Sequence, residues 1–272
     1  MQRSVIDQLK RKQIIELLEQ DKRIDGRSLE EQRKLVLETN VIPKANGSAR
    51  VLLGKTHVVS GVKIQPDRPF PDTGDRGVFI CTAEILPIAH HTAEPGPPNE
   101  TVIELARVVD RGIRESKAID ITKLVIKKDV SVVGVFADNS VIDHDGNLFD
   151  ACSYASTCAI LSSNMPKWEM VDDRPQLVKG TSELTPVQTI PVSITMARIK
   201  DHILVDPNGD EWESMDARVT ITTNSDGNIC AMQKGGTGGF TQKQLELCAD
   251  TSIKVGTRVR DMIRTTTGRN DI

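Results

Sequence analysis

The sequence predicts an α+β fold of two halves, in which mixed sheets pack against helices. Strand-like runs lead into a helix across residues 34–162 and again across 187–263. A polar, proline-punctuated stretch separates the two sets. The 272 residues, 38% hydrophobic and 27% charged, suffice for a sizeable core in one large domain or two smaller ones.

These patterns predict four segments along the chain. We expect an N-terminal helix within residues 1–24, a first domain part at 25–165, a linker at 166–186 and a C-terminal part at 187–272. The first helix should span 4–19 and break at Asp25-Gly26-Arg27. Its apolar side would consist of Val5, Ile6, Leu9 and Leu17.

The first domain part opens with strand-like runs at 34–42, 49–53, 57–64 and 78–89. Gly54-Lys55 predicts a hairpin between the second and third of these runs. Further strands follow at 124–126 and at 130–137, a valine-rich run typical of a buried strand. A helix of small residues over 148–162 should pack closely against its neighbours.

An amphipathic helix is predicted between the two strand groups of this part. Prolines 95, 97 and 98 forbid helix, and Asn99 can cap one. The apolar residues recur at helical spacing at Val102, Leu105, Ala106, Val109 and Ile113. On the opposite face, three arginines form one stripe: Arg107, Arg111 and Arg114.

This arginine stripe has two interpretations. Guanidinium groups held out from one side of a helix can grip a phosphate backbone bidentately. Alternatively, Glu104, Asp110 and Glu115 lie three or four residues away and would form ordinary helix ion pairs. Spacing alone favours the ion pairs.

The C-terminal part is predicted to hold strands at 187–199, 202–205, 218–223 and 229–233. A turn at 224–228 should join the last two strands. The final helix opens at Thr241, with Gln244 completing a capping box. Its buried stripe would be Leu245, Cys248, Ala249, Ser252, Gly256, Val259 and Ile263.

Composition excludes several classes of function. Aromatic residues make up only 3%, so base stacking on exposed rings is not a major binding mode, and a net charge of −3 gives no overall nucleic-acid footprint. The five cysteines never form a Cys-x-x-Cys pair, which favours reduced buried thiols. No signal peptide and no apolar run of about 18 residues is present. We therefore expect a cytoplasmic protein without membrane contact.

Several motifs together resemble the RNase PH family of phosphorolytic ribonucleases. They are Asp25-Gly26-Arg27, the stretch from Gly47-Ser48-Ala49 to Thr56, PGPPNE at 95–100 and ELARVVDRGIRESKAIDITKL at 104–124. The resemblance covers nearly the whole chain, and in detail the chain is most similar to the non-catalytic RNase PH-like subunit of the archaeal exosome. It implies an RNase PH-like fold of two βαβα-type halves, like ribosomal S5 domain 2.

The resemblance also implies partners and a role. Such a subunit alternates with a catalytic RNase PH-like partner in a hetero-hexameric ring, capped by proteins with S1, KH or zinc-ribbon RNA-binding domains. It takes part in 3′-to-5′ degradation of single-stranded RNA. In relatives the arginines of this helix point into the channel, which implies RNA contact by Arg107 and Arg111, and by Arg114.

Phosphorolysis itself needs a binding site for phosphate and an acidic group that can donate a proton. Active relatives carry a Gly-Ser/Thr-Arg turn where this chain has Gly146-Asn147-Leu148, and leucine cannot pair with an anion. Asp206 falls where active members place their first acidic residue, but Trp212 stands at the second position, with Asp210 and Glu211 nearby. We therefore expect no catalytic residues, no metal and no cofactor. A turn role for Asp206 is favoured.

Two alternative enzymes remain open. The chain could be a phosphorolytic 3′-5′ exoribonuclease on its own, through Asp206 with Asp210 or Glu211, or a metal-dependent phosphoesterase at Asp143-His144-Asp145. The glycine-rich run 234–240 lacks the Gly-Lys-Ser/Thr end of a phosphate loop and predicts a flexible turn. His90-His91 is not expected to bind metal, because adjacent side chains point apart on a strand.

Overall fold

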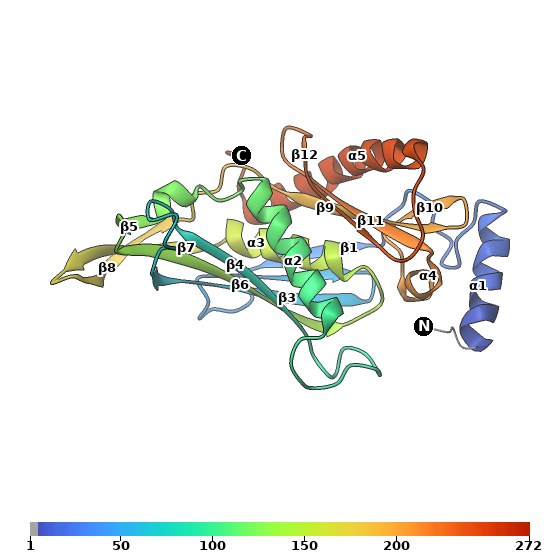
Figure 1. Ribbon diagram of the computed structural model, residues 1–272, viewed down its shortest axis with the longest axis horizontal. Helices are drawn as coiled ribbons and strands as arrows, with labels where there is room; N and C mark the ends of the chain where they lie inside the picture. Colours follow the sequence, from blue (N-terminus) through green and yellow to red (C-terminus); the bar gives the residue numbers. More distant parts are fainter. Residues whose placement is uncertain (1–4) are drawn as a thin grey trace.

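The computed structural model describes residues 5–272, without the side chains of residues 5–7 and 179. Two sheets enclose a layer of helices, and one further helix covers the outer face of the second sheet (Figure 1). The arrangement confirms the predicted α+β class with mixed sheets packed against helices. None of the helices within residues 5–272 is long and apolar enough to span a bilayer.

The first sheet is mixed and has the order β1-β2-β3-β6-β4, with β5 also paired to β6. Strand β4 runs parallel to β6, and the other pairs are antiparallel. Gly54, at φ +62°, makes the β2–β3 hairpin predicted at this point. The strands are β1 Leu35–Thr39, β2 Gly47–Leu53, β3 Thr56–Asp67, β4 Val78–Ile85, β5 Val125–Lys127 and β6 Ser131–Asp143.

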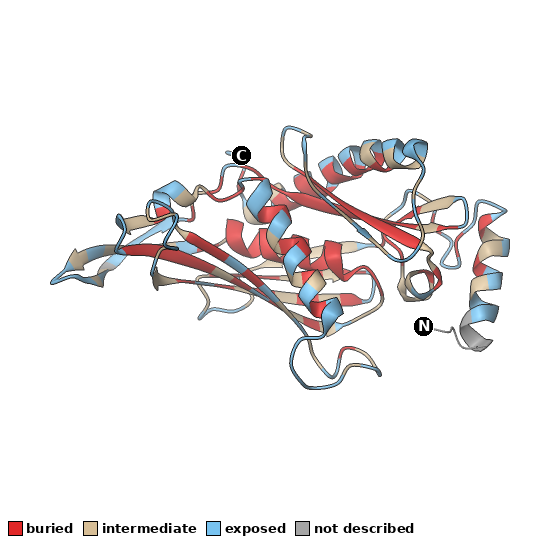
Figure 2. Cartoon of the chain, in the orientation of Figure 1, coloured by how far each residue is buried: buried red, intermediate tan, exposed pale blue. Residues whose placement is uncertain are grey.

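The helix layer contains α2 Glu100–Glu115 and α3 Leu148–Leu161, with the short 3-10 helix η1 Ile121–Leu124 after α2. Every residue of α3 is buried (Figure 2), because β2 and β3 cover one side of it and β9 the other. Ala151, Ala155 and Ala159 give the small surface that such a helix needs between two sheets. The predicted small-residue helix is confirmed.

The second sheet has the order β10-β9-β11-β12, all antiparallel. Its strands are β9 Val192–Ile199, β10 His202–Val205, β11 Ala217–Thr223 and β12 Ile229–Gly235. Helix α5 Gln242–Thr267 packs on its outer face, and the capping box of Thr241 and Gln244 forms as predicted. The short helix α4 Gly209–Ser214 was not predicted, and Leu245 and Ala249 of the expected stripe on α5 are only partly buried.

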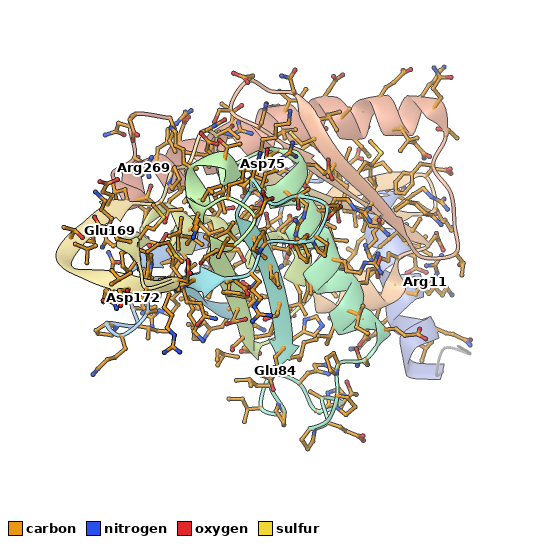
Figure 3. The ribbon with its side chains drawn as sticks, turned by 60° about the vertical axis from the view of Figure 1, so that its left-hand side comes forward. Arg11, Asp75, Glu84, Glu169, Asp172 and Arg269 are labelled. Carbon is orange, nitrogen blue, oxygen red and sulfur yellow. The ribbon has the colours of Figure 1, made fainter. Side chains whose placement is uncertain are left out.

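The stretch predicted as an unpatterned linker, 166–186, has regular secondary structure. Residues 166–184 of it belong to a two-stranded hairpin, β7 Asn164–Val171 and β8 Arg174–Leu184. Asp172 and Asp173 make its turn with φ of +49° and +56°, a conformation that aspartate tolerates. The hairpin projects from one end of the molecule, and Figure 3 shows Glu169 and Asp172 on it, away from Arg11 on α1. Sequence reasoning missed it because its prolines and charges hide the alternation of Met165, Trp168 and Met170.

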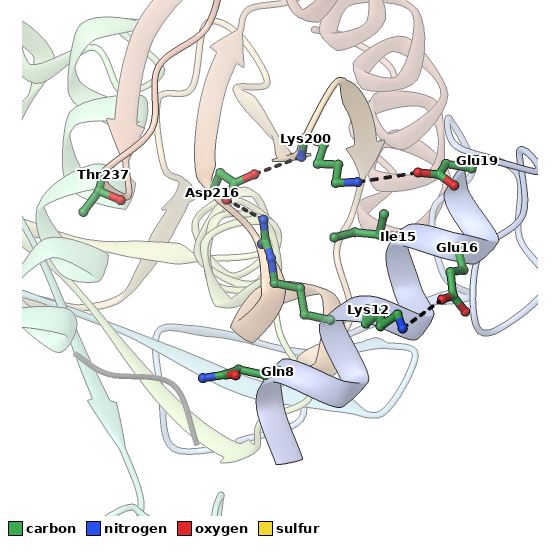
Figure 4. Close-up of a pocket in the computed structure, with 9 residues that line it drawn as sticks. Gln8, Lys12, Ile15, Glu16, Glu19, Lys200, Asp216 and Thr237 are labelled. Atoms are coloured by element: carbon green, nitrogen blue, oxygen red, sulfur yellow. Dashed lines mark hydrogen bonds and ion pairs between the residues drawn. The ribbon is translucent and has the colours of Figure 1, made fainter. Parts of the chain in front are cut away.

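The first helix, α1 Val5–Leu18, buries a different face from the one predicted. Leu9 is 64% exposed, whereas Ile14 and Leu18 pack against Ile199 and Leu204 of the second sheet. Position 4 lies outside the described residues. Asp216 links Arg11 to the backbone amide of Lys200, and the Lys200 side chain pairs with Glu19 across a hollow of about 850 Å³ (Figure 4).

Gly47, in the Gly-Ser-Ala motif, lies where β2 passes close to the end of α3. A Cβ there would lie 2.3 Å from the carbonyl oxygen of Ala159 and 2.6 Å from the Cα of Ser163. We expect Gly47→Ala to lower the free energy of unfolding by about 1–3 kcal/mol, because rigid backbone must move. Urea unfolding followed by circular dichroism measures the loss.

Gly61→Ala on β3 is the matched control, since the nearest atom to its Cβ, Cδ1 of Ile42, is 3.9 Å away. This control should unfold at or slightly above the midpoint of the unchanged protein. Equal midpoints for the two variants would contradict the packing argument.

Candidate nucleic-acid interface

Helix α2 forms where the sequence places it. Asn99 caps its start by accepting a hydrogen bond from the backbone amide of Val102 at 3.0 Å. The apolar face packs on β4 and α3, and it buries Val102, Leu105, Val108, Val109, Gly112 and Ile113, whereas Ala106 is only partly buried. The predicted apolar seam is thus confirmed apart from Ala106.

Opposite this seam, Arg107, Arg111 and Arg114 are exposed. We call these three residues the arginine ridge. Consecutive members are four and three residues apart, so their Cα atoms rise by about 6 Å and then about 4.5 Å along the helix axis. One solvent-facing surface therefore carries three permanently charged, planar hydrogen-bond donors.

The ion pairs that could have neutralised the arginine ridge form only in part. Glu104 turns instead to Arg218 on β11, at 2.6 Å, and also accepts a hydrogen bond from Gln233. Within residues 5–272, Arg107 therefore has no hydrogen-bond or ion-pair partner, while Arg111 donates only to the Gln233 amide oxygen at 3.3 Å. Of the three expected pairs, only Asp110–Arg114 forms.

Arg218 holds Glu104 because β11 fixes its position. Its guanidinium lies 4.1 Å above the ring of Phe149 and 5.5 Å from Trp212, and these two rings stack at 5.9 Å. A Cβ on Gly235 of the neighbouring strand would fall 2.5 Å from Arg218 Cζ, so any larger residue there would displace the guanidinium. Sequence reasoning missed this contact because Glu104 and Arg218 lie far apart in the chain. Arg218 on a buried strand was the one available signal.

Asp206, at the end of β10, is fully buried and engaged. Its two carboxylate oxygens accept hydrogen bonds from Arg33, at 2.7 Å and 2.9 Å from the guanidinium and 2.8 Å from the backbone amide. Asn147, the N-cap of α3, donates to it at 2.7 Å. Its backbone lies at φ +51° immediately before Pro207, in keeping with the predicted turn role.

The other two acids near this position are also engaged in ion pairs. Glu211 is buried and forms an ion pair with Arg23, whose Nε lies 2.8 Å from Oε1. The side chain of Asp210 is 40% exposed and pairs with Lys10 at 2.7 Å. Leu148 is 4% exposed and belongs to the main core, so no cation lies at the first residue of α3. The structure brings Leu148 and Asp206 together around Asn147 but leaves no free acid pair.

The weaker motifs have structural roles. The run 234–240 joins β12 to α5, and Gly236 and Gly238 allow it to pass close to the backbone of Asp216. His90 and His91 lie in a turn after β4 with ring centroids 4.2 Å apart, so the expectation that they point apart is wrong. Across the described chain, no three His, Cys, Asp or Glu side chains converge as metal ligands would.

Two buried carboxylates at the start of α3, Asp150 within the helix and Asp206 next to it, have pKa values shifted in opposite directions. Burial by itself would raise the pKa of Asp206, but the hydrogen bonds and charge of Arg33, with Asn147, hold this pKa below its usual value. Burial raises the pKa of Asp150 to about 7, against the hydrogen bonds from Asn147 and Thr195 and with the nearby Asp206 charge adding to the rise. Asp150 meets Thr195 of β9 at 2.7 Å and so links α3 to the second sheet.

We expect Asp206→Asn to destabilise the protein by about 3–5 kcal/mol, because it leaves the buried Arg33 guanidinium without its counter-charge. The exposed Asp210→Asn change should cost about 1 kcal/mol or less. The folded-state pKa of Asp206 is depressed, so its contribution is present above about pH 4 and is lost as the pH falls through that lowered value. Urea unfolding at pH 7 and pH 3 tests this, and equal losses for both variants would count against it.

Asp150 should act in the other direction. A carboxyl with a raised folded pKa binds more protons in the folded state, so its contribution falls as the pH rises from about 4 to 7. Asp150→Asn mimics the protonated acid and should reduce the loss of stability between pH 5 and pH 8. An unchanged pH dependence of the urea midpoint would rule out this assignment.

Comparison with known proteins places these features in a family. The models of the 3′ exoribonuclease family match domain 1 at residues 31–166 and domain 2 at residues 189–255. The exosome complex component Rrp42 of Thermococcus gammatolerans is 46% identical over 254 residues, covering 93% of each chain. The predicted boundaries at 25–165 and 187–272 stay a prediction.

Solved structures agree with the sequence matches. A chain of the Archaeoglobus fulgidus exosome with RNA bound to the active site superimposes with a TM-score of 0.88 at 43% identity, covering 95% of this chain and 99% of that one. Rice Rrp46 shares the fold at a TM-score of 0.69 and 16% identity, covering 90% of this chain and all of that one. The RNase PH-like fold expected from the sequence is therefore confirmed, and the chain belongs to the RNase PH-type 3′ exoribonuclease family.

Proposed function

We propose that this chain is a non-catalytic, RNA-binding subunit of an archaeal exosome ring that degrades RNA from 3′ to 5′ in the cytoplasm. It alternates with a catalytic RNase PH-like partner in a hetero-hexamer, structures that partner's active site and carries cap proteins with S1, KH or zinc-ribbon domains on one face. The names of its relatives and its likeness to an exosome chain with bound RNA support this assembly.

One observation carries the RNA role: the arginine ridge is exposed while the acid that could neutralise Arg107 is held elsewhere. Glu104 is bound to Arg218, and Arg107 and Arg111 meet no carboxylate within the described chain. Arginines whose Cα atoms are about 6 Å apart along one helix face can offer bidentate hydrogen bonds to successive phosphates. The local positive surface exists despite the net charge of −3.

The surroundings of Asp206 support the non-catalytic assignment. A general acid must reach the proton that it transfers, but Asp206 is buried with Arg33 and Glu211 with Arg23. The first residue of α3 is a core leucine instead of a guanidinium that could hold phosphate. Phosphorolysis by this chain alone through Asp206, Asp210 or Glu211 therefore finds no support in the geometry.

Arg107→Glu with Arg111→Glu should weaken binding of single-stranded RNA to the ring reconstituted with its catalytic partner. Losing two phosphate contacts should reduce the slope of log affinity against log salt by about 1.4. Filter binding over a salt series measures affinity, and phosphate-dependent release of nucleoside diphosphates measures degradation, which should slow.

Lys243→Glu with Arg258→Glu on α5 makes the same charge change on an exposed surface elsewhere and is the matched control. Size-exclusion chromatography confirms that each ring assembles. Unchanged RNA affinity in the ridge variant, or equal losses in both variants, would sink the RNA role. Nucleoside diphosphates released by the purified chain alone would instead refute the non-catalytic assignment.

A further inference from the structure

A recess of about 260 Å³ opens at the C-terminal end of α2, beside the last residue of the arginine ridge. Its floor is apolar and fixed, because Phe79, Ile113 and Ile119 are 3%, 2% and 6% exposed and belong to the main core. Drug-sized ligands occupy about 300–1,000 Å³. The recess therefore suits a smaller planar group, such as one nucleobase.

Three cations surround this apolar floor: Arg76, Arg114 and Lys117. All three are exposed. Arg76 pairs only with its neighbour Asp75, at 3.6 Å, and both side chains are more than half exposed. Lys117 lies at φ +55° just after α2 and contacts no acid within residues 5–272. Two of the three charges are thus available to an anion at the rim.

The guanidinium of Arg114 is held in an orientation that suits stacking on a base. Two hydrogen bonds of 3.0 Å to Asp110 and one of 2.7 Å to the carbonyl oxygen of Phe79 fix its guanidinium. The guanidinium lies 5.9 Å from the centre of the Phe79 ring, and the side chain stays 47% exposed. Unstacked RNA bases stack on such arginine planes as well as on aromatic rings.

The remaining lining provides hydrogen bonds for a base edge. Asp120, Thr122 and Gln188 lie at the recess, and they offer carboxylate, hydroxyl and amide groups. The Thr122 hydroxyl donates to Asp120 at 2.6 Å, which holds both groups in place. A floor for a ring, polar groups for its edge and cations for its phosphate thus converge on one small volume.

We propose that this recess binds one nucleobase of a single-stranded RNA, with its phosphate held by Arg76 or Lys117. The inference rests on the proposed RNA role of the arginine ridge and extends it, since Arg111 and Arg114 are about 4.5 Å apart along α2. An RNA strand bound to Arg107 and Arg111 would reach the recess at Arg114, the next arginine of the ridge. The ridge holds phosphates, and the recess takes a base.

Methyl NMR of the full chain tests the inference directly, because three isoleucines line the recess. Titration with adenosine monophosphate should shift the δ1-methyl signals of Ile113, Ile119 and Ile121 and leave those of Ile14 and Ile199 unchanged. Inorganic phosphate alone should produce smaller shifts at the same concentration. Absent shifts with the nucleotide, or equal shifts with phosphate, would overturn the proposal.

Thr122→Trp fills the recess and leaves Arg107 and Arg111 of the ridge unchanged. It should abolish the nucleotide shifts and weaken binding of a short oligoadenylate to the full chain by about fivefold or more. Lys117→Gln is a second variant that leaves the recess open, and it should weaken nucleotide binding at low salt. Unchanged oligoadenylate affinity in both variants, with Ile14 and Ile199 signals showing an intact fold, would show that the strand does not use the recess.

The Arg107→Glu and Arg111→Glu variant separates this inference from the proposed function. It should retain the nucleotide shifts at Ile113, Ile119 and Ile121 although it loses RNA affinity. If the shifts disappear with the ridge, the response belongs to the ridge and the recess proposal fails. If RNA affinity does not depend on the ridge while the recess still responds, the proposed function fails and the nucleotide site stands.

Discussion

Helix α3 has no surface facing solvent, and the fold depends on how its buried start is satisfied. A buried helix N-terminus needs acceptors for its free amides, and here Asn147 supplies the cap while donating to Asp206. Asp206 in turn holds Arg33 from the loop before β1. One carboxylate therefore joins the second sheet, the central helix and the first sheet. Removing its charge would leave a buried arginine without a counter-charge.

This structural use of Asp206 has a functional consequence. A carboxylate that accepts hydrogen bonds from Arg33 and Asn147 and is shielded from solvent is poorly placed to exchange protons with a substrate, which supports the proposed non-catalytic role. Glu211 is committed in the same way to Arg23. The chain retains the framework of a 3′ exoribonuclease family whose relatives include an exosome chain with RNA at the active site, while its own acids hold the fold together.

The opposite arrangement occurs on α2. There an acid is held away from the arginine ridge, because Glu104 pairs with Arg218, which is itself fixed over Phe149 and Trp212. Positive charge stays exposed on the arginine ridge although the whole chain is slightly acidic. The recess beside Arg114 extends the same surface and adds an apolar floor, so phosphate and base can be held by adjacent elements.

Local sequence determined much of this protein. Much of the order of strands and helices follows from short-range spacing and side-chain chemistry. So do the hairpin at Gly54, the cap at Asn99, the capping box at Thr241 and the exposure of the arginine stripe. The resemblance to active relatives also pointed to Leu148, which stands at the start of α3 where they carry an arginine. Such features depend on residues within a few positions of one another, where helix and strand periodicity apply directly.

Only the tertiary structure decided which partners the charged groups take. Glu104 is 114 positions from Arg218 and Asp206 is 173 from Arg33, so chain packing rather than spacing brings them together. The same reason explains the apolar face of α1, which is set by Ile199 and Leu204, and the hairpin at 164–184, whose pattern is masked by prolines and charges. The recess exists only because α2, β4 and η1 pack together in the fold and supply its lining.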